Sequence, residues 1–192
     1  MGFGDLFKKS VSKDSFVVTW LDCHKNISRS LFTQFKDIFT YKNEIDMLLA
    51  FKEIEYLVFW LLRRHLNESA MFDVYSGFLK ESKLSIDSLM EQLEIRYRLY
   101  DRALAEFTDE KHRGNPSKQG LKIGQTLINS VGNLDLMKNG VLEDKQHTDM
   151  AKTFKAFSIW FEGLKVIDSI VEKSKSKFRI EAFLRKGQLP GT

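Results

Sequence analysis

The sequence predicts an all-α protein, and three observations support that prediction. Only two of the 192 residues are prolines, Pro116 and Pro190, so a long N-terminal stretch is free of the residue that breaks helices. Apolar residues recur at alternating spacings of four and three, as they do on one face of a helix. Val- and Thr-rich alternating runs bounded by tight turns, which are typical of β-hairpins, are missing. We therefore expect a single antiparallel bundle of roughly five to seven helices.

The first two helices should form an antiparallel hairpin. The first begins near Ser15, whose side chain can cap free backbone N–H groups, and it continues to about residue 40. The second covers about 43–66, with Asn43 as its cap, and its middle is apolar on nearly all sides, as expected of a central helix. A turn between these two helices would place His24 level with about Phe59.

Four more helices follow by the same spacing criterion. They cover about residues 69–83, 85–107, 118–136 and a final stretch from within 142–149 to 172. In the third helix, the pattern turns Phe72, Tyr75 and Phe78 toward the core. In the fifth helix, each glycine lowers helix stability by roughly 1 kcal/mol relative to alanine. Gly120 and Gly124, one turn apart, would also let another helix approach closely.

The predicted domain organisation is one bundle with a short element before it and an extension after it. A chain of 192 residues is expected to form one domain. We place the bundle at 1–172, with the Gly-, Asn- and Pro-containing loop at 113–117 as an alternative boundary between two lobes. A basic C-terminal extension then covers 173–192. The N-terminal amphipathic element combines apolar and basic residues: Phe3, Leu6, Phe7 and Val11 with Lys8, Lys9 and Lys13.

The composition excludes several classes of protein. Apolar residues are 43% and charged residues 29% of the chain, which is close to ordinary globular usage and unlike disordered or collagen-like chains. No run reaches the roughly 18 apolar residues that a membrane-spanning helix needs. Cys23 is the only cysteine, so an intramolecular disulfide is excluded. The N-terminus also lacks the pattern of a secretory signal, and we therefore expect a cytoplasmic protein.

Motifs that carry known chemistry are missing from the sequence. It contains no phosphate-binding glycine loop, no nucleophile elbow, no H-E-x-x-H and no cysteine pair. Only Asp144 and His147 have the acid-to-histidine spacing of a di-metal bundle, which needs more ligands than these two. Cys23 and His24 are neighbours, but consecutive helical side chains point about 100° apart. We expect no metal, no cofactor and no catalytic residues.

Four polar residues fall on predicted apolar faces: His24, Ser28, His65 and Asp168. Buried polar groups need partners, so these side chains are candidates for a small-ligand pocket in the core. In the other interpretation, each of them makes one local hydrogen bond. In the expected hairpin His65 lies about 9 Å along the second helix from the level of His24. The two histidines then do not form one site.

Residues 172–192 carry the whole formal net charge of +4, interleaved with aromatic residues. Such a segment suits a partner protein or an anionic membrane surface, although it could also cover the bundle. Because aromatic RNA-reading motifs are missing, nucleic acid is the weakest candidate partner. The candidate partner-binding residues are Lys173, Lys175, Lys177, Phe178, Arg179, Phe183, Arg185 and Lys186.

The missing catalytic motifs and the basic extension together favour a binding function. We predict a non-enzymatic intracellular helical-bundle protein that binds a protein partner, as an adaptor, a regulator or an immunity-type inhibitor. A small-ligand-binding or enzymatic bundle with a polar core pocket is the first alternative. A peripheral membrane protein is the second. The formation of a homo-oligomer is also left as an alternative. Apolar residues that face a bundle core and those that form a dimer interface show the same pattern in sequence.

Overall fold

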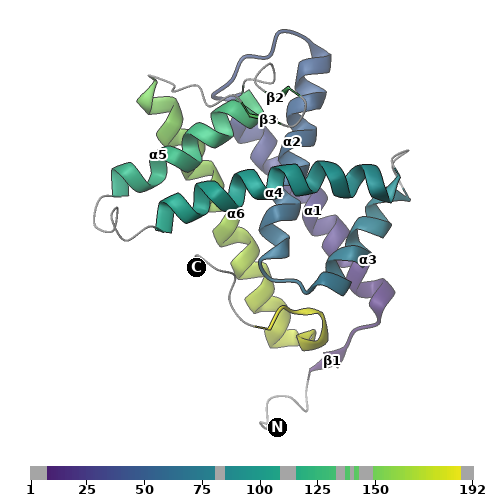
Figure 1. The fold of residues 1–192 in the computed structure, drawn as a ribbon. Coiled ribbons are helices and arrows are strands. Elements are labelled where there is room, and N and C mark those ends of the chain that lie inside the picture. The colour runs from purple at the N-terminus through teal and green to yellow at the C-terminus, as the bar shows by residue number, and fades with distance from the viewer. Residues whose placement is uncertain are drawn as a thin grey trace.

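The structure is a computed structural model that describes residues 8–80, 85–108, 116–132, 137–138, 141–142 and 149–186. Helices dominate these residues, which confirms the all-α prediction (Figure 1). The six α-helices of this part of the chain are α1 (Lys13–Lys36), α2 (Glu44–Arg63), α3 (Glu68–Leu79), α4 (Ile86–Thr108), α5 (Pro116–Leu127) and α6 (Met150–Lys177). In Figure 1, α4 lies across α1 and α2.

Side-chain caps set the start of the first three helices. The side chain of Asn43 accepts a hydrogen bond from the backbone N–H of Asp46, so this predicted cap of α2 is confirmed. Asn67 caps α3 in the same way. At α1 the prediction was wrong by one turn, because Ser12 is the cap and Ser15 lies inside the helix.

The helices α1 and α2 form the predicted antiparallel hairpin. The ring of His24 stacks on Phe59 with 3.9 Å between ring centroids, which confirms the expected register. Further along the same hairpin Phe32 meets Phe51 edge to face at 5.3 Å. As the residue number rises on α1 it falls on α2, so the two helices run in opposite directions.

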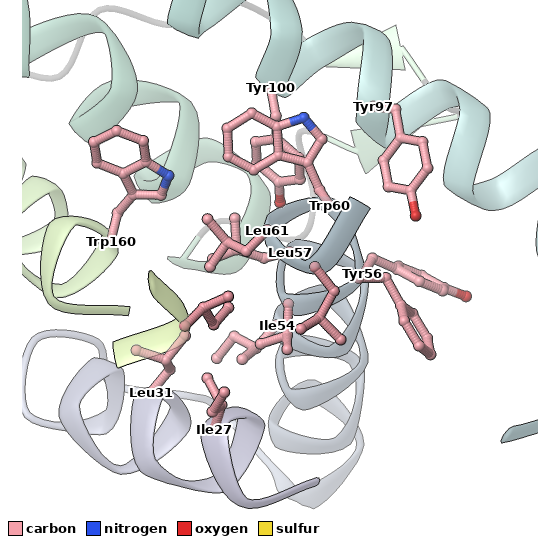
Figure 2. Close-up of a cluster of buried hydrophobic side chains, with 14 of the residues drawn as sticks. Ile27, Leu31, Ile54, Tyr56, Leu57, Trp60, Leu61, Tyr97, Tyr100 and Trp160 are labelled. Carbon is pink, nitrogen blue, oxygen red and sulfur yellow. The ribbon is translucent and has the colours of Figure 1, made fainter. Parts of the chain in front are cut away.

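The helix α2 is at the centre of the hydrophobic core. Every side chain from Tyr56 to Leu62 is buried. Trp60 of this stretch lies close to Trp160 of α6 and Tyr100 of α4 (Figure 2), with centroid distances of 6.5 Å and 5.4 Å. On another side, Ile27 and Leu31 of α1 point toward α2 (Figure 2). A helix that is apolar all round is thus covered from several directions, as the sequence pattern requires.

The region predicted as one helix at 118–136 is built differently. Regular α5 ends at Leu127 and continues as a π-helix over Ile128–Gly132, while 133–136 lie outside the described residues. The predicted close approach is confirmed at Gly124, where an added Cβ would lie 2.2 Å from the backbone oxygen of Thr153 in α6. This glycine therefore lets α5 pack directly against the α6 backbone.

Two pairs of very short strands accompany the helices. The strand β1 (Lys9–Ser10) pairs in parallel with β4 (Phe178–Arg179). The strand β2 (Met137–Lys138) pairs antiparallel with β3 (Val141–Leu142). The β1–β4 pair joins residues close to both ends of the chain, next to the lower end of α6 (Figure 1).

The residues after α6 dock onto the helices. The predicted boundary at 172/173 falls inside α6, which continues to Lys177. Beyond it lies a segment that we call the C-terminal segment, residues 178–186. Its Arg185 N–H donates to the backbone oxygen of His65 at 2.7 Å, and its Ala182 oxygen accepts from the Asn67 side chain at 2.7 Å. The ring of Phe183 stacks on Phe16 of α1 at 4.0 Å. These residues belong to the packed structure.

Some predicted features lie outside the described residues. They are Phe3, Leu6 and Phe7 of the N-terminal element, residues 113–115 of the predicted loop, the pair Asp144 and His147, and residues 187–192. Within the described part, no helix is long and apolar enough to cross a membrane.

The contact at Gly124 predicts a large cost for a single methyl group. We expect Gly124→Ala to lower the free energy of unfolding by about 1–3 kcal/mol, because the Thr153 backbone cannot move aside cheaply. The matched control is Gly163→Ala in α6, where the added Cβ meets the flexible side-chain ends of Leu31 at 3.3 Å and Leu61 at 3.6 Å and no backbone atom is among its nearest neighbours. Urea unfolding of both variants measures the difference, and equal stabilities would contradict the described α5–α6 packing.

The docked C-terminal segment predicts that its apolar residues stabilise the fold. Ile180 is only 3% exposed, so Ile180→Ala should lower the unfolding free energy by about 2–4 kcal/mol. Lys186→Ala, an exposed neighbour, should stay within about 0.5 kcal/mol of the unmodified chain. Thermal and urea unfolding followed by circular dichroism test this. If Ile180→Ala is as stable as the control, the segment is not docked in solution.

Candidate functional site

Two of the predicted pocket residues, His24 and Ser28, lie one turn apart in α1 with no exposed surface. His24 Nε2 carries the proton and donates to the backbone oxygen of Glu55 at 3.0 Å, since a carbonyl can only accept. His24 Nδ1 and Ser28 Oγ have no hydrogen-bond partner among the described residues. Phe59 and Phe78 contact the His24 ring from two sides, so this pair is enclosed by aromatic side chains.

The other two, His65 and Asp168, are brought together by the fold. His65 Nε2 lies 2.9 Å from Asp168 Oδ1, and this contact ties the end of α2 to α6. Burial lowers the pKa of His65, while the carboxylate of Asp168 opposes that shift and Arg64 adds to it. His24 stacks at the level of Phe59, which precedes His65 by six residues on α2. The four predicted residues therefore form two separate pairs.

Cys23 has the environment of a structural thiol. Burial raises its pKa, and the neighbouring carboxylate of Asp22 raises it further. The thiolate form that a nucleophile needs is thus disfavoured. Both Cys23 and His24 lie within the continuous helix α1, whose consecutive side chains point in different directions.

The predicted basic partner-binding residues have several different environments. Lys173, Lys177, Arg179 and Lys186 are exposed. Lys175 forms an ion pair with Glu172 at 2.6 Å within α6. Phe178 and Phe183 are half-buried and pack against the core. Of the eight predicted residues, only Arg185 also lines a groove between α3 and α4.

An open groove of about 870 Å³ lies between α3 and α4, next to the end of α2. We call it the α3–α4 groove. On α4 its lining side chains extend from Asp87 to Asp101, a length of roughly 21 Å at 1.5 Å per residue. They recur at helical spacing, so one face of α4 forms one wall. The lining residues are Arg63, Glu68, Met71, Phe72, Tyr75, Asp87, Met90, Glu91, Glu94, Tyr97, Arg98, Asp101 and Arg185.

The floor of the α3–α4 groove is a set of polar contacts between the helices. The hydroxyls of Tyr75 and Tyr97 are 2.5 Å apart. Asp101 accepts from Trp60 Nε1 at 2.7 Å and forms an ion pair with Arg63 at 3.3 Å. Burial raises the pKa of Tyr75 to about 12, and it raises that of Tyr97 as well, so both hydroxyls stay neutral near pH 7. These contacts hold the floor in shape.

A buried ion pair fixes how α4 is rotated against α2. Arg96 Nε donates to Glu53 Oε2 at 3.0 Å, and its Nη2 donates to the other carboxylate oxygen. The Gln92 side chain accepts from Arg96 Nη1 at 2.7 Å, and the guanidinium lies over the Tyr56 ring. Such a bidentate pair tolerates little rotation. The groove-facing residues of α4 are therefore held toward α3.

Large apolar side chains of the groove are exposed to solvent. Phe72 on α3 is 54% exposed and Met90 on α4 is 40% exposed, and both line the groove above the buried Met71. The sequence pattern predicted that Phe72 faces the core, and the structure shows that this prediction was wrong. The helical spacing of α3 shows which residues share a face, but it does not show that α4 leaves that face partly uncovered. Two exposed apolar residues facing one concave surface suit a binding site.

Acidic side chains outnumber basic ones around the groove. The carboxylates of Glu94 and Asp101 are paired with arginines. Glu68, Asp87 and Glu91 make no ion pair within the described residues, and Arg185 is the remaining groove cation. The groove is thus negative on a chain whose formal net charge is +4. Sequence reasoning missed this site, although the run of acids one helical turn apart on α4 was a usable signal.

Searches against protein-family models, curated proteins and solved structures find no match for this chain. Within the described residues, no group of three or more His, Cys, Asp and Glu side chains is arranged to hold a metal ion.

Two titratable groups, the fully buried His24 and the half-buried Glu55, predict opposite pH effects on stability. Burial lowers the pKa of His24 from 6.5 to about 4, so the unfolded chain binds a proton more readily and stability is lost as pH falls from 6.5 toward 4. Burial raises the pKa of Glu55 from 4.5 to about 7, so stability is lost as pH rises from 4.5 toward 7. In the unmodified chain the two effects oppose one another.

Removing either group should reveal the other. On acidification across this range, the free energy of unfolding of Glu55→Gln is expected to fall by up to about 3 kcal/mol more than that of the unmodified chain. The reason is that Glu55 no longer offsets the loss of stability caused by His24. His24→Leu is expected to become less stable as pH rises. Urea unfolding at several pH values between 4.5 and 7 measures both slopes. Parallel pH profiles for the two variants would show that neither group is buried as described.

Proposed function

We propose that this protein is a non-enzymatic helical-bundle binding protein that holds a segment of a protein partner in the α3–α4 groove. The observation that carries the proposal is the exposure of Phe72 and Met90 over the groove. Amphipathic partner helices commonly bind in such grooves, with apolar anchors meeting apolar side chains at the bottom. An adaptor, a regulator or an immunity-type inhibitor would each use a site of this kind.

The groove combines a rigid floor with adaptable walls. The Tyr75–Tyr97 contact and the Asp101 contacts fix the floor before any partner arrives. Met71 and Met90 are flexible thioethers that adjust to the shape of an incoming side chain. A preformed floor limits the entropy lost on binding, and flexible methionines broaden the range of anchors that fit.

The groove suits binding better than catalysis. Its tyrosine hydroxyls stay protonated near pH 7, and Asp101 is occupied by Trp60 and Arg63. The lone thiol, Cys23, lies on α1 against α6, away from the residues that line the groove. We place the protein in a reducing compartment such as the cytoplasm, because its sequence contains a single cysteine.

A core ligand site around His24 and Ser28 is the main competing proposal. The two atoms without a partner there, His24 Nδ1 and Ser28 Oγ, are polar and close in sequence. Both side chains are fully buried, so a ligand would have to be enclosed among aromatic rings. The α3–α4 groove needs no such opening, and we favour it for that reason.

Site-specific photo-crosslinking tests the proposal directly. A benzophenone amino acid placed at position 72 or 90 in the cells that make the protein should crosslink one partner. The matched control position is 48 on α2, because Leu48 is 69% exposed and does not line the groove. The expected result is a crosslinked partner from the groove positions and none from the control.

Affinity measurements on that partner complete the test. With both proteins purified, Phe72→Ala combined with Met90→Ala should weaken binding at least about tenfold, since exposed anchors dominate such interfaces. Ile45→Ala combined with Leu48→Ala removes two apolar groups elsewhere that are even more exposed, and it should change affinity less than about twofold. Equal crosslinking from all positions, or equal effects of the two double variants, would refute the groove as the binding site.

A further inference from the structure

We infer that the segment bound in the α3–α4 groove is a cationic amphipathic helix of about four turns, an inference that rests on the proposed function. The inference is based on the presence of both negative charge and exposed apolar surface in the same groove. Acidic side chains without an ion pair in the described chain line the same groove as the exposed side chains of Phe72 and Met90. A partner that buries those apolar groups must also bring groups of the opposite charge.

Both walls of the groove contribute the acidic side chains. Glu68 comes from the start of α3, while Asp87 and Glu91 come from the first turns of α4. Arg63 is paired with Asp101 and Arg98 with Glu94, and the third groove arginine, Arg185, makes no ion pair with these three acids within the described residues. Lysines or arginines on a partner helix could therefore pair with Glu68, Asp87 and Glu91.

The dimensions of the groove suit a helix better than an extended strand. The wall from Asp87 to Asp101 is roughly 21 Å long, which equals about four helical turns. The described walls are helices whose backbone groups are already hydrogen-bonded within α3 and α4. An extended peptide would find no open strand edge there to pair with. A partner helix satisfies its own backbone hydrogen bonds. The apolar side chains on one of its faces recur at the same helical spacing as the lining residues of α4.

Charge also defines which ligands the groove rejects. An acidic helix, a nucleic-acid backbone or an anionic lipid headgroup would face Glu68, Asp87 and Glu91 without compensation. Charge pairs at such an exposed rim contribute mainly specificity and association rate, and salt screens them. A cationic partner should thus bind faster at low ionic strength, whereas its apolar anchors provide most of the affinity.

The test uses three synthetic helical peptides that share one apolar pattern at i, i+4, i+7 and i+11. Their solvent-facing positions carry Lys and Arg, Gln, or Glu. Binding of each to the full chain is measured by fluorescence anisotropy at low and high salt. We expect the cationic peptide to bind at least tenfold more tightly than the acidic one, with this preference falling at high salt.

Matched charge variants locate the preference. Combined Glu68→Gln, Asp87→Asn and Glu91→Gln should weaken the cationic peptide about tenfold and leave the Gln peptide unchanged. The control removes three exposed acids outside the groove: Asp14→Asn, Asp22→Asn and Glu44→Gln. Because Glu68 and Asp87 lie in first helical turns, thermal unfolding of each variant is compared, and Glu91→Gln alone is used if the triple variant unfolds.

The outcomes separate this inference from the proposed function. If the Gln peptide binds as tightly as the cationic one, or both triple variants act alike, the charge preference is wrong while groove binding stands. If Phe72→Ala with Met90→Ala affects no peptide and no photo-crosslinked partner, both the inference and the proposed function fail. A preference for the acidic peptide would overturn the inference directly.

Discussion

The burial of the second half of α2 on every side is the constraint on which the rest of this structure depends. Its side chains from Tyr56 to Leu62 are all buried, so other elements must cover it from each direction. The elements in contact with it include α1, α3, α4, α6 and the π-helix. Most of these elements also pack on one another. The outward faces of the helices are where function can arise.

The α3–α4 groove follows from this arrangement. The short helix α3 packs more closely on α1 than on α4, and α4 is fixed to α2 by the buried pair of Arg96 and Glu53. Two helices held by different neighbours need not close on one another, and here they leave the groove between them. Polar contacts at its floor, such as Tyr75 with Tyr97, satisfy groups that would otherwise be buried without partners.

The sequence predicted what depends on local pattern and missed what depends on neighbours. The stacking of His24 on Phe59 and the Asn43 cap follow from helical spacing and capping chemistry, and both were predicted correctly. The exposure of Phe72 was not predicted, because periodicity identifies a shared face without saying what covers it. The π-helix was also missed, and the docking of residues 178–186 was only one of the alternatives that the sequence left open. They depend on long-range contacts, such as Phe183 with Phe16, that no local pattern encodes.

The central claim is that a preformed groove between α3 and α4 receives the partner. Amide hydrogen exchange of the full chain, with and without the cationic helical peptide, tests it most directly. The account predicts increased protection confined to residues 68–75 and 87–101, with the amides of α2 exchanging slowly in both states. Protection gained instead at 173–186, or no change in the groove at saturating peptide, would contradict it.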